Sequence, residues 1–266
     1  MVAQVNPASA QLGDAKRSTD PAFVLRDVTV QFGQQPPVLK DLSFQVESGQ
    51  FLALVGPSGC GKSTLLRLFA DLLGPVAGTV SRRSDVGAGQ IGFVFQQPNL
   101  LPWRTGLQNL QLPSELGRSA KEVRSEEELL DLMRQVGLKD SDKDKRPAEM
   151  SGGMQMRLSL ARALVNEPRI LLLDEPFAAV DDLLRMKLQE DVRRIHDERK
   201  LTTILVTHNL HEAAYLSDRV LVLSSAPALI RQDLQLERSS MTAEQRRTAE
   251  ETMRSLQRLT GALFQP

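Results

Sequence analysis

One stretch, GPSGCGKST from Gly56 to Thr64, limits the possible folds more than any other part of this chain. It follows an apolar run from Phe51 to Val55. It precedes apolar residues at helical spacing, namely Leu65, Leu66, Phe69, Leu72 and Leu73. A strand, a glycine-rich turn and a helix in that order form the context of a phosphate-binding loop.

The residue types in this stretch suit an anion. Glycines allow the backbone to close around phosphate oxygens, and the start of the helix adds N–H donors and a partial positive charge. We expect Lys62 to reach the outer phosphates and the Ser63 hydroxyl to bind Mg²⁺. The predicted nucleotide contacts are Gly56, Pro57, Ser58, Gly59, Cys60, Gly61, Lys62, Ser63 and Thr64. The alternative is a glycine-rich turn with a chance lysine. It requires that the agreement with the phosphate-loop motif and the strand–helix context both arise by coincidence.

Composition narrows the class of protein. The 266 residues suffice for one large domain, or for one domain with an inserted lobe. The 33 basic and 33 acidic side chains balance, so nothing overall indicates a nucleic-acid partner. Cys60 is the only cysteine, which excludes an internal disulfide; we interpret it as a small loop residue, with a redox-sensitive thiol as the alternative.

Targeting signals are not evident. No apolar run approaches the roughly 20 residues of a membrane span, and the segment Met1 to Asp20 lacks the apolar centre of a secretory signal. We therefore expect a cytoplasmic protein, with any membrane spans supplied by other chains.

The expected organisation has three parts: a flexible tail over residues 1–21, a main domain over 22–230 and a helical C-terminal tail over 231–266. In the last part Thr242 and Gln245 resemble a capping box, and Met253, Leu256 and Leu259 continue at helical spacing. The main domain begins with short strands between Phe23 and Gln50, which predict a small antiparallel sheet.

Alternating strands and helices follow, and they predict a mainly parallel sheet. The expected strands are Ile91–Phe95, Ile170–Leu173, Thr202–Thr207 and Val220–Leu223, and the expected helices include Ser151–Ala163 and Asp181–Arg199. Charged residues dominate from Leu107 onward, with apolar residues at helical spacing, so residues 107–163 are interpreted as an inserted helical lobe.

Two acids follow the most apolar of these strands. Asp174 at the strand end is placed to hold Mg²⁺ beside the phosphate loop, and Glu175 to polarise a water for attack on the γ-phosphate. A plain strand end is the alternative. His208 ends another strand of the same sheet, where it could bind the γ-phosphate and orient the water.

Two further positions complete the candidate site. Gln96 ends a third strand, so its amide could touch Mg²⁺ or water while the following loop contacts a partner; a surface glutamine without a role is the alternative. Ser151, Gly152 and Gly153 open a helix and form a second anion-binding turn. With one phosphate loop per chain, this turn makes sense if it caps the γ-phosphate of another copy, in a two-fold dimer.

These motifs, in their order along the chain, resemble the nucleotide-binding subunits of ATP-binding cassette (ABC) transporters from about Phe23 to Pro227. They are GPSGCGKST, FVFQQ with Gln96, SGGMQ from Ser151, ILLLDEP from Ile170, Asp181, and VTH with His208. The resemblance implies an α/β fold with a phosphate-loop core, a small antiparallel β subdomain and an inserted helical lobe. It also implies that ATP and Mg²⁺ are bound, that Phe32 stacks on adenine and that Asp181 contacts the dimer partner. A buried strand position is the alternative for Phe32.

The sequence departs from the family pattern at two places. The family's LSGGQ reads MSGGM from Met150 to Met154, which keeps the serine and the glycines. The family's SALD ends in Asp181 here but reads AAVD, so a serine hydroxyl is lost.

Finer features, LLPW ending at Trp103 and EPF from Glu175, are similar to importers of nitrate, sulfonates, taurine and related solutes. That resemblance implies an ATPase subunit on the cytoplasmic face of the cell membrane. Its partners would be a second copy, transmembrane permease subunits and, indirectly, an extracytoplasmic solute-binding protein. Trp103 would contact the permease or, alternatively, pack in the core.

Two rival functions remain open at this point. A soluble ABC ATPase of translation or iron–sulfur assembly is not coupled to transport, but translation members usually carry two cassettes in one chain. A non-hydrolysing nucleotide-binding regulator would not need both Glu175 and His208.

Overall fold

The computed structural model describes residues 20–116, 124–178 and 180–236, with three single positions at 254, 257 and 261. The expected tail before residue 20 and the expected C-terminal helix with Thr242, Gln245, Met253, Leu256 and Leu259 lie outside these residues.

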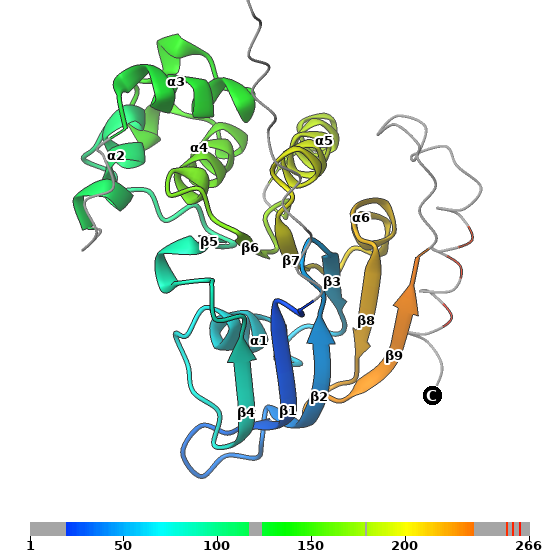
Figure 1. The fold of residues 1–266 in the computed structure, drawn as a ribbon. Coiled ribbons are helices and arrows are strands. Elements are labelled where there is room, and N and C mark those ends of the chain that lie inside the picture. The colour runs from blue at the N-terminus through cyan, green and yellow to red at the C-terminus, as the bar shows by residue number, and fades with distance from the viewer. Residues whose placement is uncertain are drawn as a thin grey trace, which may run out of the picture.

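The antiparallel sheet predicted near the start of the chain is confirmed, and it has one strand more than expected (Figure 1). Its order is β2-β1-β4, with β1 at Phe23–Val30, β2 at Leu39–Val46 and β4 at Ala77–Arg82. Phe23 packs on Phe69 with ring centroids 4.5 Å apart, so this sheet rests on the helix that follows the phosphate loop.

A six-stranded sheet forms the centre, in the order β5-β6-β7-β3-β8-β9. Its strands are β3 (Phe51–Val55), β5 (Ile91–Val94), β6 (Ile170–Asp174), β7 (Thr202–Val206), β8 (Arg219–Leu223) and β9 (Ile230–Gln235). The first five in the order run parallel, so the carboxyl ends of β3, β6 and β7 meet at one edge. Ligands of open α/β sheets bind at that edge, and all the predicted catalytic residues follow these strands.

Both faces of the parallel sheet are covered, which explains why its strands are apolar throughout. Along β6, Ile170 and Leu172 join a core with the antiparallel sheet and α1 (Lys62–Phe69), whereas Leu171 and Leu173 face the helical lobe and α5 (Asp182–Arg199). The short helix α6 (Leu210–Leu216) covers β3 and β8 through a third, smaller cluster.

The described residues of the inserted lobe, 107–116 and 124–163, contain three α-helices, and Figure 1 shows them grouped apart from the antiparallel sheet. They are α2 (Gly106–Leu116), α3 (Glu126–Gln135) and α4 (Gly152–Leu164). α4 packs against α2, α3, β5 and α5, and so joins the lobe to the main sheet. None of the helices in the described ranges combines the length and hydrophobicity that crossing a membrane requires.

Two expectations about element ends are wrong. The apolar pattern after the phosphate loop predicted a helix reaching Leu73, but α1 ends at Phe69 because Asp71 turns into the left-handed region at φ 56° and Leu72 is exposed. The main domain was expected to end at residue 230, but β9 crosses that boundary and pairs antiparallel with β8. Residues 231–235 therefore belong to the sheet and not to a helical tail.

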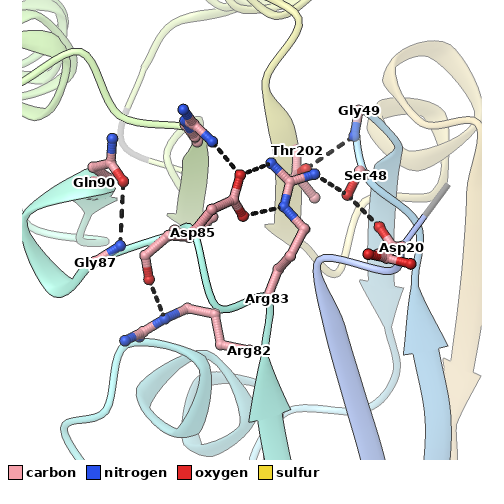
Figure 2. Close-up of polar contacts among 11 residues, drawn as sticks. Asp20, Ser48, Gly49, Arg82, Arg83, Asp85, Gly87, Gln90 and Thr202 are labelled. Carbon is pink, nitrogen blue, oxygen red and sulfur yellow. Dashed lines mark hydrogen bonds and ion pairs between the residues drawn. The ribbon is translucent and has the colours of Figure 1, made fainter. Parts of the chain in front are cut away.

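A polar network joins the two sheets at the edge remote from the phosphate loop (Figure 2). Arg83, just after β4, donates to Ser48 Oγ at 2.9 Å and pairs with Asp85 at 3.0 Å, and Asp85 also pairs with Arg169. Arg169 precedes β6, and Ser48 lies in the turn before β3. The amino ends of the parallel strands are thus tied to the antiparallel sheet, which leaves the opposite edge for the site.

Candidate nucleotide-binding and hydrolysis site

The glycines of the loop between β3 and α1 occupy positions that other residues would fill with strain. Gly61 has φ 108° and Gly59 has φ 77°, both in the left-handed region that glycine tolerates. At Gly56 a Cβ would lie 2.8 Å from the Leu223 carbonyl oxygen. Pro57, Ser58 and Gly59 are exposed at the mouth of the loop, and Cys60 to Lys62 and Thr64 are buried behind it.

Lys62 folds back over this loop. Its Nζ donates to the Gly56 carbonyl at 2.9 Å and to the Pro57 carbonyl at 2.8 Å. An ammonium has three N–H donors, so these two bonds leave one for a phosphate oxygen. The buried charge is thereby held at the loop, where an anion would bind.

Cys60 lies in the same loop but has a different environment from a reactive thiol. Its side chain is buried, and this burial raises the pKa of the thiol although the nearby Lys62 charge opposes the shift. A thiol with a raised pKa stays protonated at neutral pH and is a poor nucleophile. The structure favours the interpretation of Cys60 as a small loop residue.

Ser63 and Asp174 meet as the sequence predicts. The Ser63 hydroxyl donates to Asp174 Oδ1 at 2.8 Å across the β6 end. Burial raises the pKa of Asp174, the Ser63 hydrogen bond lowers it, and the neighbouring Glu175 charge raises it. A hydroxyl and one carboxylate are donors that suit Mg²⁺, which keeps several waters and takes few protein ligands.

Glu175 and His208 also meet. His208 Nδ1 lies 3.1 Å from Glu175 Oε2, although the two residues follow different strands. Glu175 has φ 46°, and its N–H donates to the Val206 carbonyl at 3.0 Å, so the backbone at the end of β6 is fixed against β7. A left-handed non-glycine residue is a strained position of the kind that clusters at functional sites.

Gln96 and Phe32 are two further predicted residues, and both are exposed. Gln96 is exposed two residues beyond β5, beside the β6 end. Phe32 follows β1 and is 42% exposed, so it is not a buried strand residue and its ring is accessible to a base.

Ser151 and Asp181 serve as helix caps. Ser151 Oγ accepts from the Met154 N–H at 3.3 Å and Asp181 Oδ1 accepts from the Leu184 N–H at 3.1 Å. Ser151 and Gly152 are exposed, and a Cβ on Gly153 would lie 3.7 Å from Val180, so the two caps are neighbours. α4 packs with the lobe, while α1 packs on β4, β6 and β7, so the Ser151 turn and the phosphate loop belong to different parts of the chain.

Trp103 lies on the loop between β5 and α2. It is 68% exposed, which excludes the core-packing alternative. The buried Asn109 side chain accepts from the Leu101 N–H at 2.8 Å and donates to the Thr105 carbonyl at 2.9 Å, so it fixes the turn that carries the indole.

Sequence reasoning missed one group of residues in the second layer of this site. A cavity of about 70 Å³ adjoins Glu175 and His208, and its walls include Thr207, Arg185 and Glu212. Arg185 and Glu212 look like ordinary surface charges on helices in the sequence, and no spacing marks them.

The fold and this edge define the class: an α/β nucleotide-binding protein with a phosphate loop opening its first core helix. Comparison with known families and structures identifies the family within this class. The family described as ABC transporter matches residues 39–178. The chain belongs to that family.

Relatives of known name support the same family assignment. An aliphatic sulfonates import ATP-binding protein of Burkholderia thailandensis is 42% identical over 252 residues, covering 94% of this chain and 72% of the relative. One of Pseudomonas savastanoi pv. phaseolicola is 44% identical over 197 residues, covering 74% and 78%. Among solved structures, a dimeric post-hydrolysis state of an ATP-binding cassette bound to ADP and Pi is 29% identical, with TM-score 0.71, covering 82% of this chain and all of that chain.

These findings confirm the fold class and the expected ABC-type ATPase of an import system. The chain is an ATP-binding, ATP-hydrolysing transport subunit, and the alternative of an ATPase uncoupled from transport is disfavoured.

Proposed function

We propose that this chain powers uptake of a small organic sulfonate or a related solute, such as taurine or nitrate, through a separate permease. The names of the relatives support the sulfonate class. One observation supports the proposed ATP hydrolysis: Glu175 and His208 lie 3.1 Å apart, next to the Ser63–Asp174 pair behind a phosphate loop.

The proposed roles divide between binding and hydrolysis. The backbone from Gly56 to Thr64 and the Lys62 ammonium hold the phosphates, and Phe32 stacks on the adenine. Ser63, Asp174 and Gln96 hold Mg²⁺, which when bound neutralises charge on the outer phosphates. Glu175 accepts the proton of the attacking water, and His208 holds both Glu175 and the γ-phosphate in place.

Two copies complete the site. Ser151, Gly152 and Asp181 are exposed and lie close together, with Gly153 buried beneath them, and we propose that this patch closes over the nucleotide of a second copy. Solved ABC cassettes of similar fold are dimers. In this proposal the chain works at the cytoplasmic face of the cell membrane, bound to permease subunits that receive solute from an extracytoplasmic binding protein.

Two variants test these roles. Glu175→Gln is expected to bind ATP normally, to slow hydrolysis about 10²–10⁴-fold and to accumulate an ATP-bound dimer, because only the general base is lost. Lys62→Ala is expected to weaken ATP binding itself. Hydrolysis rates, nucleotide affinity and mass by light scattering distinguish the two. A Glu175→Gln protein that hydrolyses ATP at the wild-type rate contradicts the assignment of the base.

A further inference from the structure

We propose that Glu212 is a positioning residue that holds His208 in place through the Thr207 hydroxyl. This inference rests on the proposed role of His208 in hydrolysis. The proposed connection runs from the buried Glu212 carboxylate on α6, through the Thr207 hydroxyl at the end of β7, to the turn that carries the His208 imidazole.

Glu212 is a charged residue in an unusual location. It lies in the first turn of α6, yet it is only 5% exposed. Its Oε2 accepts a hydrogen bond from Thr207 Oγ1. A buried carboxylate is costly to keep in a protein unless its oxygens are hydrogen-bonded, so this bond is a strong geometric constraint.

The carboxylate also sets the direction of the Thr207 hydroxyl. A threonine hydroxyl has one hydrogen to donate, and Thr207 donates it to Glu212 Oε2. The Thr207 oxygen then accepts from the Asn209 N–H at 3.0 Å. This second bond closes the turn over residues 207–209, and His208 is the central residue of that turn.

The far side of the turn is fixed as well. Asn209 Oδ1 caps α6 by accepting from the His211 N–H at 2.9 Å and from the Glu212 N–H at 3.4 Å. The His208 side chain is 60% exposed, so the turn is the main constraint on where its ring lies. From this backbone position its Nδ1 lies 3.1 Å from Glu175 Oε2.

The cavity beside the site connects these groups. Glu212, Thr207, His208 and Glu175 all line it, and Arg185 forms another wall. Arg185 donates to the Phe177 carbonyl at 3.3 Å and to the Val180 carbonyl at 2.9 Å, so the segment after Glu175 is held from α5. Glu212 performs the matching function for the segment that carries His208.

A merely structural role is the competing explanation. A buried acid in the first turn of a helix could stabilise α6 without affecting the chemistry. The two explanations differ in one respect: a residue that acts through His208 has no further effect on hydrolysis once the imidazole is gone.

The experiment is a set of mutant cycles on the full chain, with steady-state ATP hydrolysis as the readout. Glu212→Met and Thr207→Val each remove one partner at similar volume, and each is made in the wild type and in His208→Ala. Glu212→Gln and Thr207→Ser keep a hydrogen-bonding oxygen and serve as matched conservative variants. Thermal unfolding midpoints report folding, and the nearly isosteric Thr207→Val carries the test if Glu212→Met does not fold.

We expect Glu212→Met and Thr207→Val to lower kcat about 10-fold to 100-fold with little change in KM for ATP, because misplacement of one catalytic group has that effect. The two conservative variants should stay within about fivefold of wild type, since an oxygen acceptor or hydroxyl remains. In His208→Ala, neither substitution should lower kcat further.

Three results would contradict the proposal. Wild-type kcat in both Glu212→Met and Thr207→Val overturns it, as does an equal fall in the wild-type and His208→Ala backgrounds. If His208→Ala itself retains wild-type kcat, the proposed role of His208 fails first, and the inference fails with it. The first two results leave the proposed function standing.

Discussion

His196 lies on the inner side of α5, with Nδ1 2.9 Å from Thr203 Oγ1 and its ring centroid 5.0 Å from that of Phe51. Burial lowers the pKa of this imidazole to about 4, and the adjacent Arg193 charge contributes in the same direction. Asp218 and Asp197 oppose the shift without reversing it. The folded protein therefore requires a neutral imidazole at this position.

This requirement makes stability depend on pH in a defined window. The unfolded chain binds the His196 proton near pH 6.5 and the folded chain only near pH 4, so protonation favours unfolding. The contribution of His196 is complete above pH 6.5 and falls by roughly 3 kcal/mol at pH 4. Urea unfolding of the wild type and of His196→Gln at several pH values checks this. The free energy of unfolding of the wild type should fall more steeply between pH 6.5 and 4, and parallel curves would contradict the assignment.

At the same scale, the sequence predicts the proposed ligand-contacting residues better than the proposed positioning residues. Lys62, Asp174, Glu175 and His208 follow strands in a recognisable pattern, and the structure brings them to one edge. Glu212 gives no such signal, because an acid in the first turn of a helix is ordinary. Its burial and its bond to Thr207 arise only when α6 packs on the sheet.

At the scale of elements, strands with continuous apolar runs were predictable and polar edge strands were not. The sequence predicts β3, β6 and β7 well because strands buried on both faces are continuous apolar runs. β4 and β9 were missed because at least half of their residues are exposed, and the partner of β4, β1, also lies far away in the sequence. The early end of α1 was missed for a similar reason, since the apolar spacing continues past the turn at Asp71.

The junction of the lobe with α5 contains a buried ion pair. Arg157 of α4 is almost fully buried, and it pairs with Asp191 of α5 at 2.7 Å and donates to the Val136 carbonyl at the end of α3. Removing one partner of a buried pair leaves an uncompensated charge. The pair thus joins three helices at the boundary between lobe and main domain.

We expect Asp191→Ala to lower the free energy of unfolding by about 3–5 kcal/mol, because Arg157 then lacks its counter-charge. Glu198→Ala on the same helix is the matched control: its pair with Arg194 is at the surface and should contribute less than about 1 kcal/mol. Chemical denaturation of both variants provides the measurement. Equal losses would mean that the buried pair has no special role at this junction.

At the scale of the whole molecule, the site and the Trp103 loop are linked by the lobe. Arg162 of α4 donates to the carbonyls of Pro98 and Asn99 at 2.9 Å each, and these residues come two and three positions after Gln96. The helix that begins at Ser151 therefore ends at the loop that exposes Trp103. In the proposed dimer, a change at Ser151 is expected to reach the Trp103 loop through this one helix, which would connect the ATP state to an external surface.

That path gives a prediction for the assembled transporter. An exposed tryptophan on a braced loop is the kind of side chain that dominates a protein interface, and its truncation typically costs 2 kcal/mol or more. Trp103→Ala is therefore expected to lower the affinity for the permease roughly 30-fold. Leu229→Ala, another exposed apolar residue but on the turn before β9, is the matched control and should bind normally. Titration of each subunit into permease-containing vesicles, read as stimulated ATP hydrolysis, measures the difference; equal affinities would place the docking surface elsewhere on the molecule.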